Sequence, residues 1–223
     1  LYTWDEIPQD LKNGKPGDYE ISGTITGTLA RIRATATCGE VKGINHYSET
    51  GTTLVQSYED TYVIYPGEQL YLDNTTVEGV LKDGTRFSNL KVNWDEYDSN
   101  PKESCTITGT VAGTNIPATI HVIVTDKWKA ELDTIKVLKG HDGSGLLPTN
   151  VILVSPDVKD QSVHHSKYAS VTWNAKGFDW SQGGIVSGTA QLSYYTGSNS
   201  SVVDIPVTAN VQVVNRATSV QGG

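Results

Sequence analysis

The sequence has few of the residues that would point to several large classes of protein. It has only two cysteines in 223 residues, which excludes a disulfide-dense scaffold. It also has no methionine. Its 17 basic residues against 25 acidic ones give a formal net charge of −8, which argues against a nucleic-acid partner or an anionic membrane surface. The longest apolar run is four residues, as in Val151–Val154, whereas a membrane span needs about 20, so no membrane insertion is expected.

Threonine, valine and glycine are abundant instead. The chain contains 26 threonines, 23 valines and 22 glycines. Threonine and valine are stiff at χ1 and suit a pleated, half-buried surface, and glycine supplies turns. Many stretches alternate apolar and polar residues, and few show helical periodicity. The composition therefore predicts an all-β protein.

An internal repeat organises the chain. Trp94 and Trp173 lie in similar strand-like segments, 79 residues apart. Gly109 and Gly188 each lie in a Gly-Thr landmark after the tryptophan, and they are also 79 residues apart. Two independent landmarks at one offset indicate a true repeat, and such a repeat has to be found before the fold is assigned.

A third, shorter copy lies at the start of the chain. Trp4 corresponds to Trp94 at an offset of 90, and Gly23 corresponds to Gly109 at an offset of 86. The four extra residues between these landmarks fit the loop-like stretch 9–14. This copy begins just before its tryptophan strand, so the first strands of the repeat are missing from it.

Each copy closes with a strand of period two, in which one face is apolar. Short strands with frequent turn signals are typical of a β-sandwich, and a tryptophan on a central strand commonly pins the core between the sheets. We therefore predict Trp4, Trp94 and Trp173 as structural core residues. The inward positions of the three closing strands are Ile32, Ala34, Ala36 and Cys38; Ala118, Ile120, Val122 and Val124; and Val207, Ala209, Val211 and Val213.

These motifs resemble a known family. Val-Asn-Trp-Asp at 92–95, Gly-Thr-Val-Ala-Gly-Thr at 109–114 and the alternating strand at 116–124 are similar to a bacterial immunoglobulin-like domain. Residues 1–41 match the second half of that pattern, and residues 168–214 match it with a longer final loop. The resemblance implies tandem immunoglobulin-like β-sandwiches with an incomplete first copy.

The resemblance also implies a domain organisation and a context. Residues 1–41 would be the C-terminal half of one immunoglobulin-like domain, 42–127 and 128–216 two complete domains, and 217–223 a tail. Such domains occur in tandem in secreted and cell-surface bacterial proteins and as ancillary modules of extracellular glycoside hydrolases. They share no catalytic residues, and fold alone does not give function.

The best candidates for ligand contact are aromatic residues of the third copy. Tyr194 and Tyr195 precede the stretch 196–201, which reads as a long loop found in that copy alone. Together with Trp180 they could stack on the faces of sugar rings. The alternative is that these aromatics pack in the core, as most do, while Trp128 wedges the junction between the second and third copies.

No catalytic or metal-binding pattern stands out. The run 141–145 contains His, Asp and Ser, but it reads as a glycine-rich loop because a catalytic triad is defined by geometry and not by adjacency. The pair His164-His165 reads as a solvated loop without further metal ligands. We expect no enzyme activity, no metal and no cofactor.

Three functions remain open at this point. The chain could be a structural spacer of a secreted or cell-surface protein, a binding module for a glycan or a host surface ligand, or an interaction protein. In the third case the half-domain 1–41 would be completed by the remainder of the parent protein or by another chain. The missing strands favour a completing segment, because half a sandwich leaves its apolar face open.

Two further expectations concern the cysteines and the stability of the copies. Cys38 and Cys105 occupy positions predicted to face inward in two different copies, so both should be free thiols. Trp94 and Trp173 give the second and third copies separate cores, so these copies should unfold independently.

Overall fold

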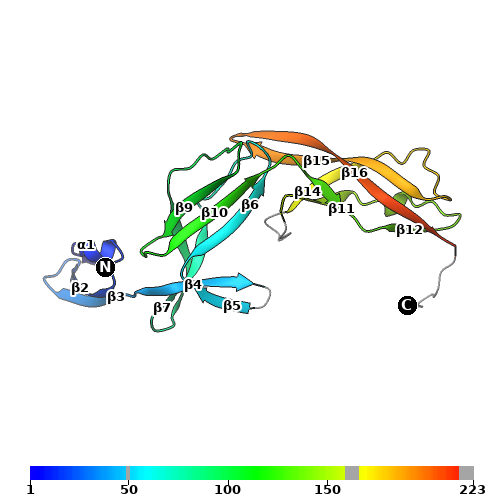
Figure 1. Cartoon of the computed structure of the whole chain (residues 1–223). Coiled ribbons are helices and arrows are strands. Elements are labelled where there is room, and N and C mark those ends of the chain that lie inside the picture. Colours follow the sequence, from blue (N-terminus) through cyan, green and yellow to red (C-terminus); the bar gives the residue numbers. More distant parts are fainter. Residues whose placement is uncertain (49–50, 159–165, 216–223) are drawn as a thin grey trace, which may run out of the picture. The chain divides into compact units, whose positions relative to one another are not determined.

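The computed structural model describes residues 1–48, 51–158 and 166–215 (Figure 1). Within these residues the chain forms sixteen strands in three sheets, one short α-helix and one 3₁₀ turn. The all-β prediction is confirmed.

The chain divides into two compact units. The first comprises Leu1–Asp60, Tyr71–Tyr97 and Thr106–His121, and the second comprises Thr61–Leu70, Asp98–Cys105 and the chain from Val122 on. These units do not follow the repeat boundaries, so the division into 1–41, 42–127 and 128–216 stays a prediction.

The first sheet has three antiparallel strands in the order β1-β2-β3. They are β1 (Tyr2–Trp4), β2 (Gly17–Ile25) and β3 (Arg31–Cys38), and the helix α1 (Gln9–Lys12) lies between β1 and β2 in the chain. The guanidinium of Arg31 on β3 pairs with the carboxylate of Asp5, which follows β1. This ion pair joins the two outer strands of the sheet.

The second sheet has seven strands in the order β5-β4-β7-β8-β9-β10-β6. The strands are β4 (Val41–Ser48), β5 (Gly51–Val55), β6 (Tyr58–Ile64), β7 (Thr76–Leu81), β8 (Arg86–Trp94), β9 (Cys105–Val111) and β10 (Pro117–Val124). One core cluster consists of Ile44, Val77, Val92, Val111, Ile116 and Ala118, and Trp94 packs against it. The period-two alternation of these strands places their apolar residues in this core.

The third sheet has six strands in the order β11-β13-β14-β15-β16-β12. The strands are β11 (Lys129–Glu131), β12 (Ile135–Leu138), β13 (Asn150–Val154), β14 (Ser166–Trp173), β15 (Gly184–Thr196) and β16 (Asn199–Val214), and the 3₁₀ turn is Ser144–Leu146. β12 runs parallel to the end of β16, whereas β11 pairs antiparallel with β13. The two strands that open this repeat therefore lie at opposite ends of the strand order.

The same three-strand motif occurs in all three sheets. A strand ending in tryptophan pairs with a strand carrying the landmark glycine, and that strand pairs with the alternating strand that closes the repeat. The register aligns Trp4 with Gly23, and it aligns the tryptophans of the other two copies with their landmark glycines in the same way. β1-β2-β3, β8-β9-β10 and β14-β15-β16 are thus equivalent, as the sequence repeat predicts.

One stretch that was predicted to be a loop forms paired strands and a tight turn instead. Residues 196–201 were expected to form a long loop, but β15 pairs with β16 along the whole length of β15, from Gly184 opposite Val211 to Thr196 opposite Asn199. Gly197, with φ +66°, and Ser198 make the tight turn. The prediction was wrong because the serines and asparagine of this stretch, although typical of loops, extend the paired strands.

Both cysteines are free, as predicted. Cys38 is half-buried at the end of β3. Cys105 is exposed at the start of β9, so its prediction as an inward residue was wrong. The inward pattern of β9 begins only at Ile107, where the strand reaches the core.

We expect two thiols per chain when the unreduced protein is denatured and titrated with a thiol reagent. In the native chain, partial burial and the nearby Asp98 carboxylate raise the pKa of Cys105. Because the thiolate is the reactive form, alkylation of Cys105 should be slow at neutral pH and should accelerate as the pH rises through this raised pKa. The variant Cys105→Ser, which should retain one thiol, is the control, and a count of zero in the wild type would contradict the assignment.

Candidate functional site

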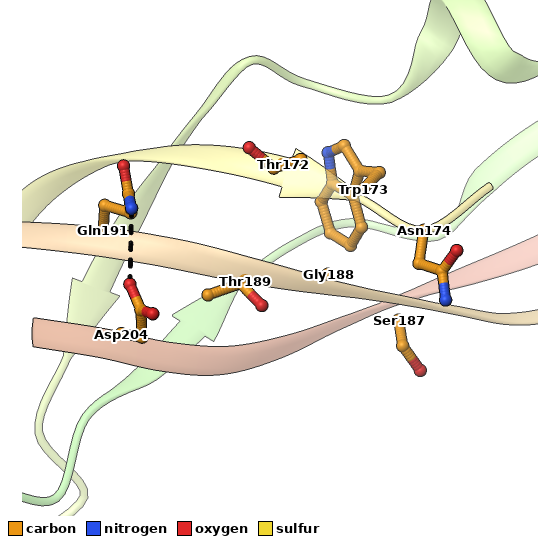
Figure 2. A pocket seen from close by; sticks show the side chains of 8 residues that line it. All are labelled: Thr172, Trp173, Asn174, Ser187, Gly188, Thr189, Gln191 and Asp204. Carbon is orange, nitrogen blue, oxygen red and sulfur yellow. Dashed lines mark hydrogen bonds between the residues drawn. The ribbon is translucent and has the colours of Figure 1, made fainter. Parts of the chain in front are cut away.

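The landmark tryptophan and glycine of the third sheet form a tightly packed pair. Trp173, at the end of β14, lies across Gly188 of β15 (Figure 2). A Cβ atom added to Gly188 would lie 2.6 Å from Trp173 Cε3 and 3.0 Å from the carbonyl oxygen of Thr172. The indole Nε1–H donates to the carbonyl oxygen of Pro148 at 2.7 Å. Glycine is therefore required for the ring to lie against the neighbouring strand.

A groove of about 540 Å³ opens beside this pair. Besides Trp173 and Gly188, it is lined by Thr172, Asn174, Ser187, Thr189, Gln191 and Asp204. Gln191 Nε2 donates to Asp204 Oδ1 at 3.4 Å across β15 and β16 (Figure 2). The polar side chains of the groove alternate with the buried residues of β15 and β16, so they face away from the core against which the Trp173 ring packs. Their hydroxyl, amide and carboxylate groups could hydrogen-bond a sugar ring.

The same pair occurs in the other two copies. A Cβ atom on Gly109 would lie 2.9 Å from Trp94 Cε3, and one on Gly23 would lie 3.0 Å from Trp4 Cε3. Trp94 Nε1 donates to the carbonyl oxygen of Leu72 at 3.1 Å, as Trp173 does to a carbonyl in its own copy. The recurrence favours a structural role for the pair, because each repeat needs it whatever ligand a single copy binds.

The three predicted core tryptophans differ in how well they are covered. Trp94 is half-buried against the core of the second sheet. Trp173 is half-buried between two clusters of the third sheet, one around Leu153 and one formed by Val137, Val186 and Val211. The side chain of Trp4 is 38% exposed. The sequence could not show this difference, because the three local motifs are alike.

The predicted ligand-contacting aromatics do not form one site. The ring of Tyr194 packs on that of Tyr65 with 4.9 Å between centroids, and Trp180 packs edge-on against Phe178 at 4.8 Å. Tyr195 is exposed. Trp180 precedes β15 whereas the tyrosines lie near its far end, about 30 Å further along the strand. A glycan-binding role for these residues stays a prediction.

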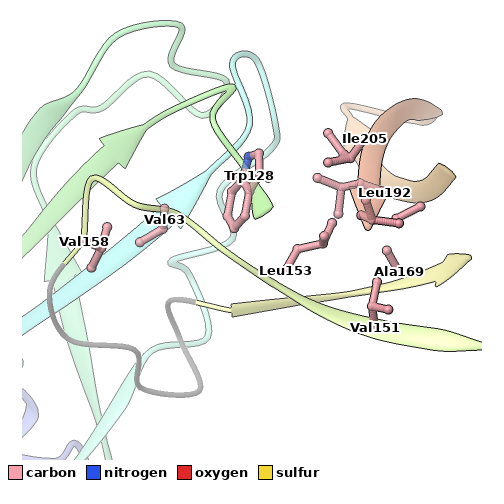
Figure 3. Close-up of a cluster of buried hydrophobic side chains, with 10 residues drawn as sticks. Val63, Trp128, Val151, Leu153, Val158, Ala169, Leu192 and Ile205 are labelled. Atoms are coloured by element: carbon pink, nitrogen blue, oxygen red, sulfur yellow. The ribbon is translucent and has the colours of Figure 1, made fainter. Parts of the chain in front are cut away.

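Trp128 is at the centre of a cluster that joins residues of the second and third copies (Figure 3). Its side chain is 7% exposed, and its Nε1–H donates to the carbonyl oxygen of Thr125 at 3.0 Å. Val63 of β6 belongs to the same buried cluster, and Ile123 of β10 packs against it. The cluster is made up of Val63, Trp128, Val151, Leu153, Val158, Ala169, Ala190, Leu192, Ile205 and Val207.

This cluster changes the expectation of independent unfolding. Val63 lies within the predicted second domain, 42–127, but it is buried with residues of the predicted third domain, 128–216. Removing either partner leaves apolar surface exposed on the other. We therefore expect the two copies to be coupled in unfolding.

An ion pair lies beside the cluster. Lys167 Nζ contacts Glu68 Oε1, and the two side chains are only 20% and 15% exposed. The backbone N–H of Tyr65 donates to Glu68 Oε2 at 2.9 Å, and that of Gln69 donates to the carbonyl oxygen of Tyr195 at 2.7 Å. This ion pair could not be predicted from local sequence patterns, because its members are 99 residues apart and neither belongs to a motif.

The remaining predictions concern metal and membrane contacts. In the ranges 1–48, 51–158 and 166–215, no three metal-ligating side chains come together. The His164-His165 pair lies outside the described residues, as does the predicted tail 217–223. No helix of the described chain has both the length and the apolarity to cross a membrane.

Comparisons with known proteins add little beyond the chain's own geometry. No protein-family model and no curated protein matches the sequence. An E-to-A variant of titin domains I67–I69 is 11% identical, with 91% of this chain and 76% of that one covered, at a TM-score of 0.22. A mouse PcdhgC3 EC1-3 structure is 10% identical, with 90% and 77% covered, at a TM-score of 0.19.

An I-band fragment I67–I69 from titin gives similar values, with 11% identity and a TM-score of 0.20, and the alignment covers 92% of this chain and 76% of the fragment. Similarities at these TM-scores carry no argument about function. The fold is established from the sheets and registers of the chain itself. They show an all-β protein in which the same three-strand motif recurs in three sheets, and within the described residues the first sheet consists of this motif alone.

Proposed function

We propose that this chain is a non-catalytic structural module of a secreted or cell-surface bacterial protein. In this role its immunoglobulin-like repeats hold a neighbouring part of the protein at a set distance or orientation. The observation that carries the proposal is the buried cluster around Trp128, which takes residues from both the second and the third repeat. A shared core restricts motion between repeats, whereas domains joined by exposed linkers move freely.

The connecting segment between the repeats supports this role. Thr125, directly after β10, is 6% exposed. Its Oγ1 contacts Asp157 Oδ2 at 3.1 Å and accepts a hydrogen bond from the Lys127 backbone N–H at 3.0 Å. Lys127 Nζ is 3.7 Å from the same Asp157 oxygen. These contacts hold the connecting segment to residues of its own compact unit.

Replacing Glu68 with glutamine tests whether the second and third repeats are held together rigidly. The variant keeps the shape of the side chain but removes the charge that faces Lys167, so we expect a loss of about 1–3 kcal/mol in the free energy of unfolding. Relaxation of backbone ¹⁵N nuclei should give one correlation time for both repeats in the wild type and separate times in the variant. Glu20→Gln, in an exposed pair with Arg33, is the matched control and should change stability by less than about 0.5 kcal/mol.

Separate correlation times in the wild type would contradict a stiff joint.

The groove at Trp173 favours a second candidate, a glycan-binding ancillary module of an extracellular glycoside hydrolase. A glycan that saturates and shifts the Trp173 indole N–H signal would favour this alternative over the structural one.

A further inference from the structure

The first sheet exposes an apolar face that its equivalents bury. Ile32, Ala34 and Ala36 of β3 are only half-buried, and Gly23 is the sole fully buried residue in 1–38, a segment that the structure describes throughout. The equivalent residues of β10 and β16 are 0–1% and 0–6% exposed, respectively. Those residues are Ala118, Ile120 and Val122, and Val207, Ala209 and Val211.

The same difference holds across the rest of the face. Ile21 of β2 is half-buried, whereas its equivalents Ile107 and Val186 are 5% and 1% exposed. Trp4 and Ile25 are each 38% exposed. Each large apolar side chain left in water forgoes about 1.5–3 kcal/mol of burial free energy, so covering this face would be strongly favourable.

The complete copies show what covers such a face. In the third sheet, β12 runs parallel along β16, and β13 runs antiparallel along β14. In the second sheet, β6 lies beside β10 and β7 lies beside β8. The equivalent edges of the first sheet, along β3 and β1, have no strand beside them among the described residues.

The first copy also differs from the other two in the hydrogen bond of its tryptophan indole N–H group. Trp94 and Trp173 donate to carbonyl oxygens of Leu72 and Pro148, each in the segment before the strand that flanks the tryptophan strand. Within the described chain, the Trp4 indole has no such acceptor. Among the described residues the first copy therefore lacks one coherent set of partners: an edge strand at β3, an edge strand at β1, and the carbonyl that precedes the latter.

We propose that the face of β1-β2-β3 binds a polypeptide segment, other than the described residues, that carries the opening strands of this same type of repeat. One of its strands runs parallel along β3, as β12 does along β16, and the next runs antiparallel along β1. Their alternate apolar residues cover Ile21, Ile32 and Ala34, and a carbonyl at the start of the second strand accepts the Trp4 indole N–H. Main-chain pairing supplies affinity, and the alternating side chains supply specificity.

A second copy of this chain is a poor occupant by comparison. Its own strands of the required type, β6 and β12, already pair with β10 and β16. To donate either one, the second copy would have to open a complete repeat and expose a core that is now buried. A partner whose strands are not already paired avoids that cost.

Hydrogen exchange on the full chain tests the proposal. The probes are two synthetic peptides with the sequences of residues 58–81 and 129–154, which hold the equivalent strands of the second and third copies. The β3 amides that point away from β2 should exchange fast in the free chain. At saturating peptide they should slow by at least about tenfold, because exchange then requires release of the added strand.

Two variants make the result specific. Ala34→Asp places a carboxylate on the apolar face of β3 and should abolish the protection, whereas Thr35→Asp, on the exposed face of the same strand, should retain it. A circular dichroism spectrum checks that both variants keep their strands. Absence of protection with both peptides would overturn the proposal, as would protection without peptide that increases with chain concentration, which would assign the face to a second copy.

Discussion

Replacement of Trp128 with alanine is expected to lower the free energy of unfolding by about 3–5 kcal/mol. The side chain is 7% exposed and lies in the cluster that contains Val63 as well as Leu153 and Leu192. Its removal leaves a cavity and deletes the hydrogen bond to the Thr125 carbonyl. Because the stability of a whole domain is about 5–15 kcal/mol, the loss should appear as a large shift of the denaturant midpoint.

The variant should also separate the unfolding of the two copies. Without the indole, Val63 of β6 loses packing in the cluster that it shares with the third sheet, so a single cooperative transition should become two. Tyr168→Ala on β14 is the matched control, because that ring is 75% exposed and its removal should change stability by less than about 0.5 kcal/mol. Two transitions already present in the wild type would show that the cluster does not couple the copies.

Gly188→Ala is the second change with a large expected effect. The added methyl group would lie 2.6 Å from the ring of Trp173, which is held from the other side by its hydrogen bond to Pro148. The ring cannot retreat without losing that bond and its contacts with the core, so we expect a loss of about 1–3 kcal/mol. Chemical denaturation measures the loss, and the Trp173 indole N–H signal should shift with it.

Gly145→Ala provides the matched control in the same unit. A Cβ atom at Gly145 meets nothing within 4 Å, and the residue needs no positive φ. This variant should be as stable as the wild type or slightly more so, because alanine reduces the entropy of the unfolded chain. If Gly188→Ala were equally neutral, the close approach of Trp173 to β15 would not be a requirement of the repeat.

Local sequence patterns predicted the repeat and the all-β fold, because short motifs recur at similar offsets and many short stretches alternate apolar and polar residues. The period-two alternation of β16 follows from residues that are neighbours along the strand, whereas the pairing of Trp173 with Gly188 required the structure. Residues 196–201 were misassigned because serine and asparagine occur in loops and in paired strands alike. Only the pairing partner decides between these two structures.

Contacts between distant segments could not be predicted. Cys105 shares the parity of the inward residues of β9, but the strand has not yet reached the core at that point. Glu68 and Lys167 pair only because the chain brings residues of two copies together. The open face of the first sheet was predicted from the missing strands, whereas the exposure of Trp4 required the structure.

The parallel pairing of β12 with β16 has a mechanical consequence. β12 opens the third repeat and β16 closes it, and Ile135–Leu138 align with Val211–Val214 in the same direction. Tension that pulls the two ends of this repeat apart draws these strands past each other along their length. Their evenly spaced hydrogen bonds are then loaded in shear and must break together rather than one at a time. The repeat is thus built to resist extension along the chain at the strand pair that ties its beginning to its end.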